Sequence, residues 1–290
     1  MTLSHWVDAA HRAAYERAYE AALGLWPIPH ASAWVDTPLG TTHVVVSGNP
    51  TGAPLVLLPA ASLSATQWYA QAAALGVAHR LFAVDILGDI GRSTQTTPLH
   101  SRADAAAWLR AVLDGLGIAT ASLVGASFGG FLAANLTTLA PERVHALALL
   151  APAATLQPFA TAARLFIRLG SLVPLPSTVR PGLRGMMGGR LPDARLVEQM
   201  ERGVAGFRYD RAGLFPGALP DGDLRRIACP TLVLVGADER IYDAARAVAR
   251  ARALIPQGTT AVLPGLGHLL SLQDPATVNA HLGDFLVGRH

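Results

Sequence analysis

Short apolar runs alternate along this chain with stretches in which apolar residues recur at helical spacing. A half-exposed strand alternates strictly between apolar and polar residues, and these apolar runs do not. Continuous apolar runs are typical of parallel strands that are buried on both faces. Strands that alternate with helices in this way predict an α/β fold, with a mostly parallel sheet covered by helices on both faces. The expected strands are residues 41–46, 54–58, 80–85, 121–124, 144–150, 231–235 and 260–263, and the expected helices are residues 5–26, 101–116, 130–136, 243–255 and 275–287.

Residues 155–228 interrupt this alternation. The segment holds many proline and glycine residues, shows short helical patches at 159–169 and 193–205, and has no convincing strand pattern. We expect it to form a mostly helical cap, inserted into a core made of residues 1–154 and 229–290. Caps of this kind often close a substrate pocket, and the alternative is an ordinary surface insertion.

Composition narrows the classes of function. The 290 residues are 51% hydrophobic and carry a formal net charge of +3. That is enough apolar material for a large core and too little charge to indicate a nucleic-acid partner. All 23 basic residues are arginine. The lack of lysine excludes Schiff-base chemistry, a serine–lysine dyad and a phosphate-binding P-loop, since each of these needs a lysine.

Nothing in the pattern points to a membrane or to a cofactor. The first residues lack a basic segment followed by an apolar one, and no apolar run approaches the ~20 residues of a membrane span, so we expect a soluble, cytoplasmic protein. No histidine–carboxylate cluster has metal-ligand spacing, and neither a metal nor an organic cofactor is implied. The single cysteine, Cys229, cannot form an intramolecular disulfide and is expected to be a buried, inert thiol.

The main chemical signal is Gly125-Ala126-Ser127-Phe128-Gly129, which lies between an expected strand and an expected helix. A G-x-S-x-G sequence in that setting is the signature of a nucleophile elbow, a strained turn that presents the serine at the edge of the sheet. The two glycines allow neighbouring elements to approach closely. The sequence therefore predicts Ser127 as a nucleophile.

A serine hydroxyl needs a base to remove its proton, and that base must itself be oriented by an acid. In folds with a nucleophile elbow the chain order is serine, acid, histidine. His268 follows the last expected strand on a loop with glycines at 265 and 267, so its imidazole can reach the edge of the sheet. No other histidine of the chain has this position, and His268 is the predicted base.

The acid has two adjacent candidates. Asp238 and Glu239 both follow the expected strand 231–235, and two neighbouring carboxylates cannot both face the histidine. Asp243 is expected instead to cap the next helix by accepting hydrogen bonds from its free amides.

A tetrahedral intermediate needs two backbone amides aimed at its negative charge. One is expected from Phe128, directly after the nucleophile, and the other from Ala61, in the loop after the strand 54–58. Asp85 is expected to stabilise the loop 88–93 rather than to act on substrate. Candidates for an apolar substrate pocket, some of which could equally be cap core, are Ser62, Trp68, Phe159, Phe166, Met186, Met187, Phe207 and Tyr209.

Taken together, these features resemble the α/β-hydrolase superfamily, and more narrowly the bacterial carboxylesterases of the naproxen-esterase type. The resemblance runs from the first helix to the last. The residues that carry it are 25–27, 42–48, 83–89, 108–118, 125–129, 141–144 and 239–243.

The resemblance implies acyl-transfer chemistry and bears on the choice of acid. In this group the acid is a glutamate followed by the same Ile-Tyr-Asp that this chain carries at 241–243, which favours Glu239 and leaves Asp238 as the runner-up. The chain departs from the group at Pro59-Ala60, where His-Gly is expected, and at Phe128, where leucine or methionine is common. The first departure bears on the geometry of the oxyanion loop.

The sequence thus predicts a serine hydrolase that cleaves carboxylic esters of small, fairly apolar substrates through Ser127, His268 and Glu239. The Pro59-Ala60 departure motivates an alternative, a biosynthetic thioesterase, cyclising acyltransferase or lyase with the same three residues. A third hypothesis is a ligand-binding protein that keeps the fold without the chemistry. The expected partner is a small ester or acyl substrate, not nucleic acid, and the sequence leaves open whether the protein is a monomer or a homodimer.

Overall fold

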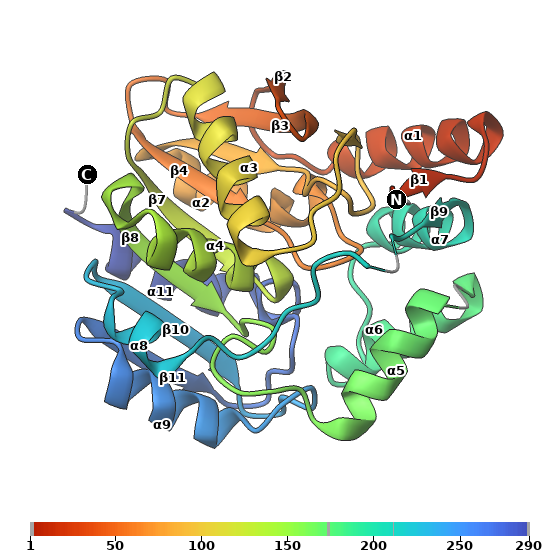
Figure 1. Ribbon diagram of the computed structural model, residues 1–290. Helices are drawn as coiled ribbons and strands as arrows, with labels where there is room; N and C mark the ends of the chain where they lie inside the picture. The colour runs from red at the N-terminus through yellow and green to blue at the C-terminus, as the bar shows by residue number, and fades with distance from the viewer. Residues whose placement is uncertain (1–2, 173–174, 211, 289–290) are drawn as a thin grey trace.

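The computed structural model describes residues 3–172, 175–210 and 212–288, apart from the side chains of residue 166 and residues 168–172. Within these ranges, nine strands form one sheet (Figure 1), in the order β11-β10-β8-β7-β4-β5-β3-β2 with β6 paired to β3. The strands are β2 His30–Thr37, β3 Gly40–Gly48, β4 Ala53–Leu58, β5 His79–Val84, β6 Thr94–Gln95, β7 Ala121–Ala126, β8 Val144–Leu150, β10 Thr231–Gly236 and β11 Gly258–Leu263.

Most of the sheet is parallel. All pairings from β11 through to β5 are parallel, whereas β3 runs antiparallel to β5, β2 and β6. This confirms the predicted mostly parallel sheet. Because the carboxyl ends of parallel strands meet at one edge, the loops after β4, β7, β10 and β11 come together there.

Helices cover both faces of the sheet, as the apolar runs predict. On β7 and β10, Leu123 and Val233 pack against one set of helices, and the adjacent Val124 and Leu234 pack against the other. Each strand is therefore buried on both sides, which removes the in-and-out alternation from its sequence. One face carries α3 Arg102–Gly115, α4 Phe128–Leu139, α8 Asp221–Arg225 and α9 Ala244–Leu254, and the other carries α1 Ala9–Leu23, α2 Tyr69–Gly76, α10 Leu270–Gln273 and α11 Pro275–Leu286.

Polar side chains fix where several helices begin. Ser101 and Asp104 form a reciprocal capping box at the start of α3, which satisfies two backbone amides that the helix leaves free. Asp243 accepts a hydrogen bond from the amide of Arg246 at 3.0 Å, so the prediction that Asp243 caps α9 is confirmed. Asp8 caps α1 by accepting from the amide of His11 at 2.8 Å, and α1 is therefore shorter than the predicted helix over 5–26.

The segment 155–228 is mostly helical. Its helices between residues 161 and 206 lie to the right of the sheet in Figure 1, whereas the short helix α8 lies at the left and packs beside α9. It comprises α5 Thr161–Leu172, the 3₁₀ helix η3 Pro176–Thr178, α6 Val179–Met186, α7 Ala194–Gly206, β9 Phe207–Arg208 and α8. The expectation that it contains no strand is wrong, because β9 pairs antiparallel with β1 His5–Trp6. This two-residue pairing joins the segment to the N-terminal region.

The same segment has a small apolar core of its own. Leu183 and Leu196 pack there with Leu63, from the loop after β4, and with Leu269, from the loop after β11. The segment thus lies over the sheet edge where the loops converge, which is the place a cap occupies. Its treatment as a separate cap domain stays a prediction.

Candidate active site

Ser127 lies at the turn between β7 and α4. Its φ of +49° falls in the left-handed region, which residues with a side chain seldom adopt. The amide of Ser127 donates to the carbonyl of Leu150 at 2.9 Å, and its carbonyl accepts from the amides of Phe131 at 3.1 Å and Ala153 at 2.9 Å. These bonds hold the strained turn in place. The serine therefore has the strand–turn–helix setting of a nucleophile elbow.

The two glycines of the motif are required by close backbone packing. A Cβ atom on Gly125 would lie 2.4 Å from the carbonyl oxygen of Gly129, and one on Gly129 would lie 2.1 Å from the carbonyl oxygen of Leu58. Both distances are far below van der Waals contact. The packing brings β4 and the start of α4 together, so that the loop after β4 lies beside Ser127.

His268 reaches Ser127 from the loop after β11. Its Nε2 lies 2.8 Å from Ser127 Oγ, and the residue is only 5% exposed. The loop is held by Gln273, whose side chain accepts from the amide of Gly267 at 2.8 Å, and by a 3.4 Å bond from the amide of Leu269 to the carbonyl of Met186 in α6. The structure thus brings the predicted base to the predicted nucleophile.

Glu239 completes the chain of hydrogen bonds. Its Oε2 lies 2.6 Å from His268 Nδ1, its Oε1 accepts from the amide of Ile241 at 2.8 Å, and its side chain is fully buried. A carboxylate at Nδ1 assigns the proton to that nitrogen and leaves Nε2 as the acceptor facing Ser127. Asp238, by contrast, is exposed. Of the two candidate acids, the structure brings Glu239 to the histidine.

Tyr242 packs beside His268 in the buried part of the site. Its ring meets the ring of His268 edge-on at 6.3 Å between centroids, and its buried hydroxyl has no hydrogen-bond partner among the described residues. Burial and the nearby Glu239 raise the pKa of Tyr242 well above its usual value, so the hydroxyl stays neutral. The residue appears in the sequence resemblance only as part of Ile-Tyr-Asp, and no spacing rule assigns it a place beside His268.

The loop after β4 leaves one amide free beside the serine. The carbonyl of Pro59 accepts from the amide of Gly129 at 3.0 Å, and the amide of Ala60 donates to Gln67 Oε1 at 2.8 Å. The amide of Ser62 donates to Asp89 at 3.1 Å. Within the described part of the chain, the amides of Ala61 and Phe128 have no acceptor. These are the two amides that the sequence predicts as donors of the oxyanion hole.

The other predicted side chains have varied surroundings. Trp68 and Phe207 are buried in the core on the α1 face of the sheet, and Met187 is buried in the core of the segment 155–228. Met186 packs against that same core, and Phe159 packs against Phe215 at 5.5 Å between ring centroids. The side chain of Phe166 lies outside the described residues. That any of them contacts substrate stays a prediction.

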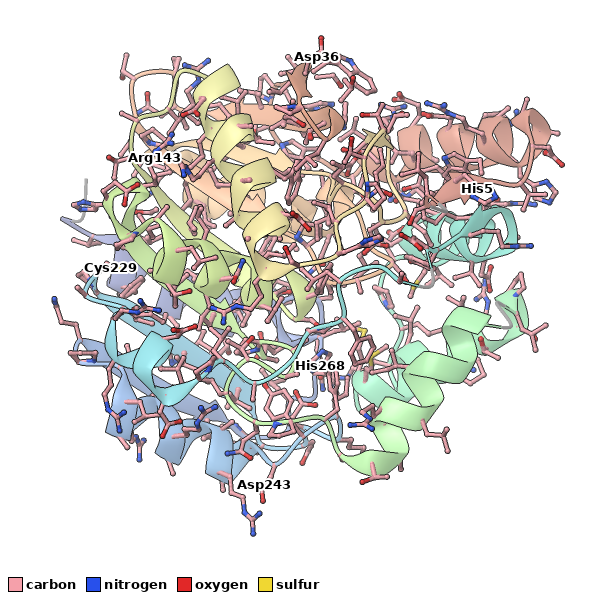
Figure 2. The ribbon with its side chains drawn as sticks, in the orientation of Figure 1. His5, Asp36, Arg143, Cys229, Asp243 and His268 are labelled. Carbon is pink, nitrogen blue, oxygen red and sulfur yellow. The ribbon has the colours of Figure 1, made fainter. Side chains whose placement is uncertain are left out.

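Two further predictions concern residues away from the triad. Asp85 is fully buried and accepts from the amides of Ala65 at 2.7 Å and Arg92 at 2.9 Å, so its predicted structural role in the loop is confirmed. Figure 2 shows His268 at the end of the sheet nearer α5 and Cys229 at the opposite end. Cys229 is a partly buried free thiol, and burial raises its pKa.

The described residues form neither a metal-ligand cluster nor a membrane-spanning helix. In the ranges that the structure describes, no three His, Cys, Asp or Glu side chains gather as metal ligands would. No described helix is both long enough and apolar enough to cross a membrane.

Comparison of the chain with known proteins identifies the family to which it belongs. The model of the alpha/beta hydrolase family matches residues 55–281, which include the elbow, Glu239 and His268. The chain belongs to the α/β-hydrolase family. The fold and the superfamily expected from the sequence are thereby confirmed.

The similar proteins within the α/β-hydrolase family include named carboxylesterases. The chain is 35% identical over 277 residues to the uncharacterized carboxylesterase nap of Bacillus subtilis, covering 93% of this chain and 91% of the relative. It is 33% identical over 288 residues to the carboxylesterase YbfK of the same species, covering 94% of each. The crystal structure of naproxen esterase from B. subtilis superposes with a TM-score of 0.90, at 35% identity, covering 96% of this chain and 99% of that one. The protein is a carboxylesterase-like hydrolase.

Proposed function

We propose that the protein is a serine esterase that hydrolyses carboxylic esters of small, fairly apolar substrates through a Ser127–His268–Glu239 triad. The observation that supports this most is the unbroken chain of hydrogen bonds from Glu239 through His268 to Ser127, with lengths of 2.6 and 2.8 Å. All three side chains are buried or nearly so, and charged hydrogen bonds are stronger there than in water.

Acylation begins when Ser127 Oγ attacks the carbonyl carbon of the ester. His268 Nε2 takes the hydroxyl proton as the new C–O bond forms, and Glu239 stabilises the resulting imidazolium. The carbonyl oxygen becomes an oxyanion that accepts hydrogen bonds from the amides of Ala61 and Phe128. When the tetrahedral intermediate collapses, the bond to the leaving oxygen breaks and His268 returns its proton to that oxygen, which releases the alcohol.

Deacylation repeats the same steps with water. His268 Nε2 takes a proton from water while the oxygen attacks the acyl carbon, and the oxyanion occupies the same two amides. The bond to Ser127 Oγ then breaks, Oγ recovers a proton from His268, and the carboxylic acid leaves. The alcohol leaves with the proton that Ser127 gave up, and Ser127 recovers a proton from water, so the enzyme returns to its starting protonation state.

The restricted access to the triad favours small substrates. Ser127 is only 9% exposed and His268 only 5%, so the substrate has to reach a largely buried hydroxyl, which a small ester does more easily than a bulky one. Despite the departure at Pro59-Ala60, the amide of Ala61 has no acceptor among the described residues, whereas the amide of Ala60 donates to Gln67. The loop therefore retains a donor that ester hydrolysis requires.

Turnover by the purified protein tests the proposal. We expect p-nitrophenyl butyrate to be hydrolysed faster than p-nitrophenyl decanoate and faster than an N-acetylcysteamine thioester of butyrate, with the rate lost in Ser127→Ala. Turnover of the thioester alone would support the alternative biosynthetic chemistry. Absence of turnover above the Ser127→Ala background on all three compounds would contradict the proposal.

A further inference from the structure

The loop that carries the Ala61 amide is supported by a buried carboxylate. Asp89, on the loop after β5, is only 4% exposed. Both of its carboxylate oxygens accept from the amide of Ser62 at 3.1 Å, and Oδ1 also accepts from the amide of Ile90 at 2.6 Å. No cation among the described residues forms an ion pair with Asp89. Its charge is therefore stabilised by neutral donors, which include the amide of Ser62 in the oxyanion loop.

Tyr209 joins the same network from the segment 155–228. Its hydroxyl donates to Asp89 Oδ1 at 2.7 Å and lies 2.8 Å from Ser62 Oγ. Because the tyrosine proton is given to Asp89, the Ser62 hydroxyl is the donor in the second bond. Burial and the neighbouring Asp89 raise the pKa of Tyr209 well above its usual value, so the hydroxyl keeps the proton that it donates.

Ser62 needs this support. Its φ is +62°, in the left-handed region that favours glycine. Its neighbour Ala61 provides the amide expected to face the oxyanion, and the amides on either side of Ala61 are tied to buried side chains, Ala60 to Gln67 and Ser62 to Asp89. The direction of the Ala61 amide is therefore set by its two anchored neighbours.

From this arrangement we infer that Asp89 and Tyr209 are positioning residues that hold the oxyanion loop in its catalytic geometry. Neither touches the reacting atoms; both act through Ser62. Since Tyr209 belongs to the segment 155–228, the position of the Ala61 amide in the oxyanion hole depends on how that segment packs over the sheet. The inference rests on the proposed esterase function, because only a reaction with an oxyanion uses the Ala61 amide in this way.

The matched variants are Tyr209→Phe and Tyr15→Phe. Each removes one buried tyrosine hydroxyl that links the segment 155–228 to the rest of the protein, since Tyr15 accepts from Gln199 of α7 at 3.0 Å. Only Tyr209 bonds to Asp89 and Ser62. Tyr15 also interacts with Ser64 of the loop after β4, but it does not reach Asp89. A general loss of packing would affect both variants equally, whereas a loss transmitted through Asp89 and Ser62 would be larger in Tyr209→Phe.

The assay measures kcat and KM for p-nitrophenyl butyrate and the inhibition constant of a trifluoromethyl ketone. Ser127 Oγ attacks the carbonyl carbon of the ketone, and the adduct carries a stable oxyanion. Removing an oxyanion donor outright lowers kcat about 100- to 1,000-fold. We expect misplacement of that donor in Tyr209→Phe to lower kcat about 10-fold. KM should stay within about twofold, and the inhibition constant should rise by the same factor as kcat falls, because both report affinity for the oxyanion. Asp89→Asn should show a larger loss of the same kind.

The results separate the two proposals. If the wild type hydrolyses no ester, the proposed function has failed. If the wild type is active but Tyr209→Phe retains its kcat and its affinity for the ketone, the inference is wrong. Equal losses in Tyr209→Phe and Tyr15→Phe would also overturn it. Should Asp89→Asn fail to fold, Tyr209→Phe decides the question alone.

Discussion

Replacing Glu239 by glutamine removes one charge and keeps the shape of the side chain. During acylation His268 becomes an imidazolium, and its Nδ1 lies 2.6 Å from Glu239 Oε2. With charge centres about 3 Å apart and an effective dielectric constant of about 20, the attraction is about 5.5 kcal/mol. That free energy corresponds to a factor of about 10⁴ in rate.

The hydrogen bonds around Glu239 also fix the orientation of the substituted glutamine, and this orientation further lowers the rate. In Glu239→Gln the amide oxygen can continue to accept from Ile241, as Oε1 does at 2.8 Å. The amide nitrogen then faces His268 Nδ1 and favours the tautomer with its proton on Nε2. That tautomer presents a donor to Ser127 Oγ and cannot take its proton. The charge effect and the tautomer effect therefore act in the same direction.

The assay is kcat for p-nitrophenyl butyrate, with Asp238→Asn as the control because Asp238 is the exposed neighbour. We expect Glu239→Gln to lose about 10⁴-fold in kcat with an unchanged melting temperature, and Asp238→Asn to stay within about twofold. A Glu239→Gln enzyme within tenfold of the wild type would refute this reasoning. So would an Asp238→Asn enzyme that loses as much as Glu239→Gln.

Three further predictions concern stability, each measured by urea unfolding. Burial raises the pKa of Asp89 from 3.8 to about 6, so the folded state binds this proton more tightly than the unfolded state. The free energy of unfolding of the wild type minus that of Asp89→Asn should then fall by about 2 kcal/mol between pH 4 and pH 7; a difference independent of pH would contradict it. Gly129→Ala should cost about 3 kcal/mol or more, because its Cβ would lie 2.1 Å from the Leu58 carbonyl oxygen, and a cost under about 1 kcal/mol would count against that clash. Ser101→Ala should cost about 1 kcal/mol through loss of the α3 capping box, and no measurable loss would show that the cap contributes nothing.

The sequence predicts the parallel part of the fold well because burial on both faces marks it. Strands β7 and β10, which precede Ser127 and Glu239, are buried at every position. Strand β11, which precedes His268, lies at the edge of the sheet and buries only its last residue, Leu263. The edge strand β2 was not predicted. Of its eight residues only Val35 is buried, and Trp34 is 55% exposed, so β2 carries no apolar face for a pattern to reveal.

In the site as well, some residues can be predicted from local sequence, and others come together only in the folded chain. Ser127 can be assigned from the G-x-S-x-G motif between a strand and a helix, and His268 from its place on the glycine-bearing loop after the last strand. The choice between Asp238 and Glu239 depended on the family resemblance, because sequence spacing does not determine which of two adjacent side chains points toward the histidine. The Asp89–Tyr209 bond joins residues 120 positions apart. No periodicity or motif relates them, and only the folded segment 155–228 brings them together.

The esterase activity that we propose depends on Ser127 being a nucleophile activated by His268. Its most direct test is the intact mass of the protein after reaction with a p-nitrophenyl alkylphosphonate, which leaves the phosphonyl group on an activated serine. We predict one adduct per chain in the wild type, mapped to Ser127 by peptide mass, and none in Ser127→Ala. An adduct that persists in Ser127→Ala, or a folded wild type that forms none, would contradict the account.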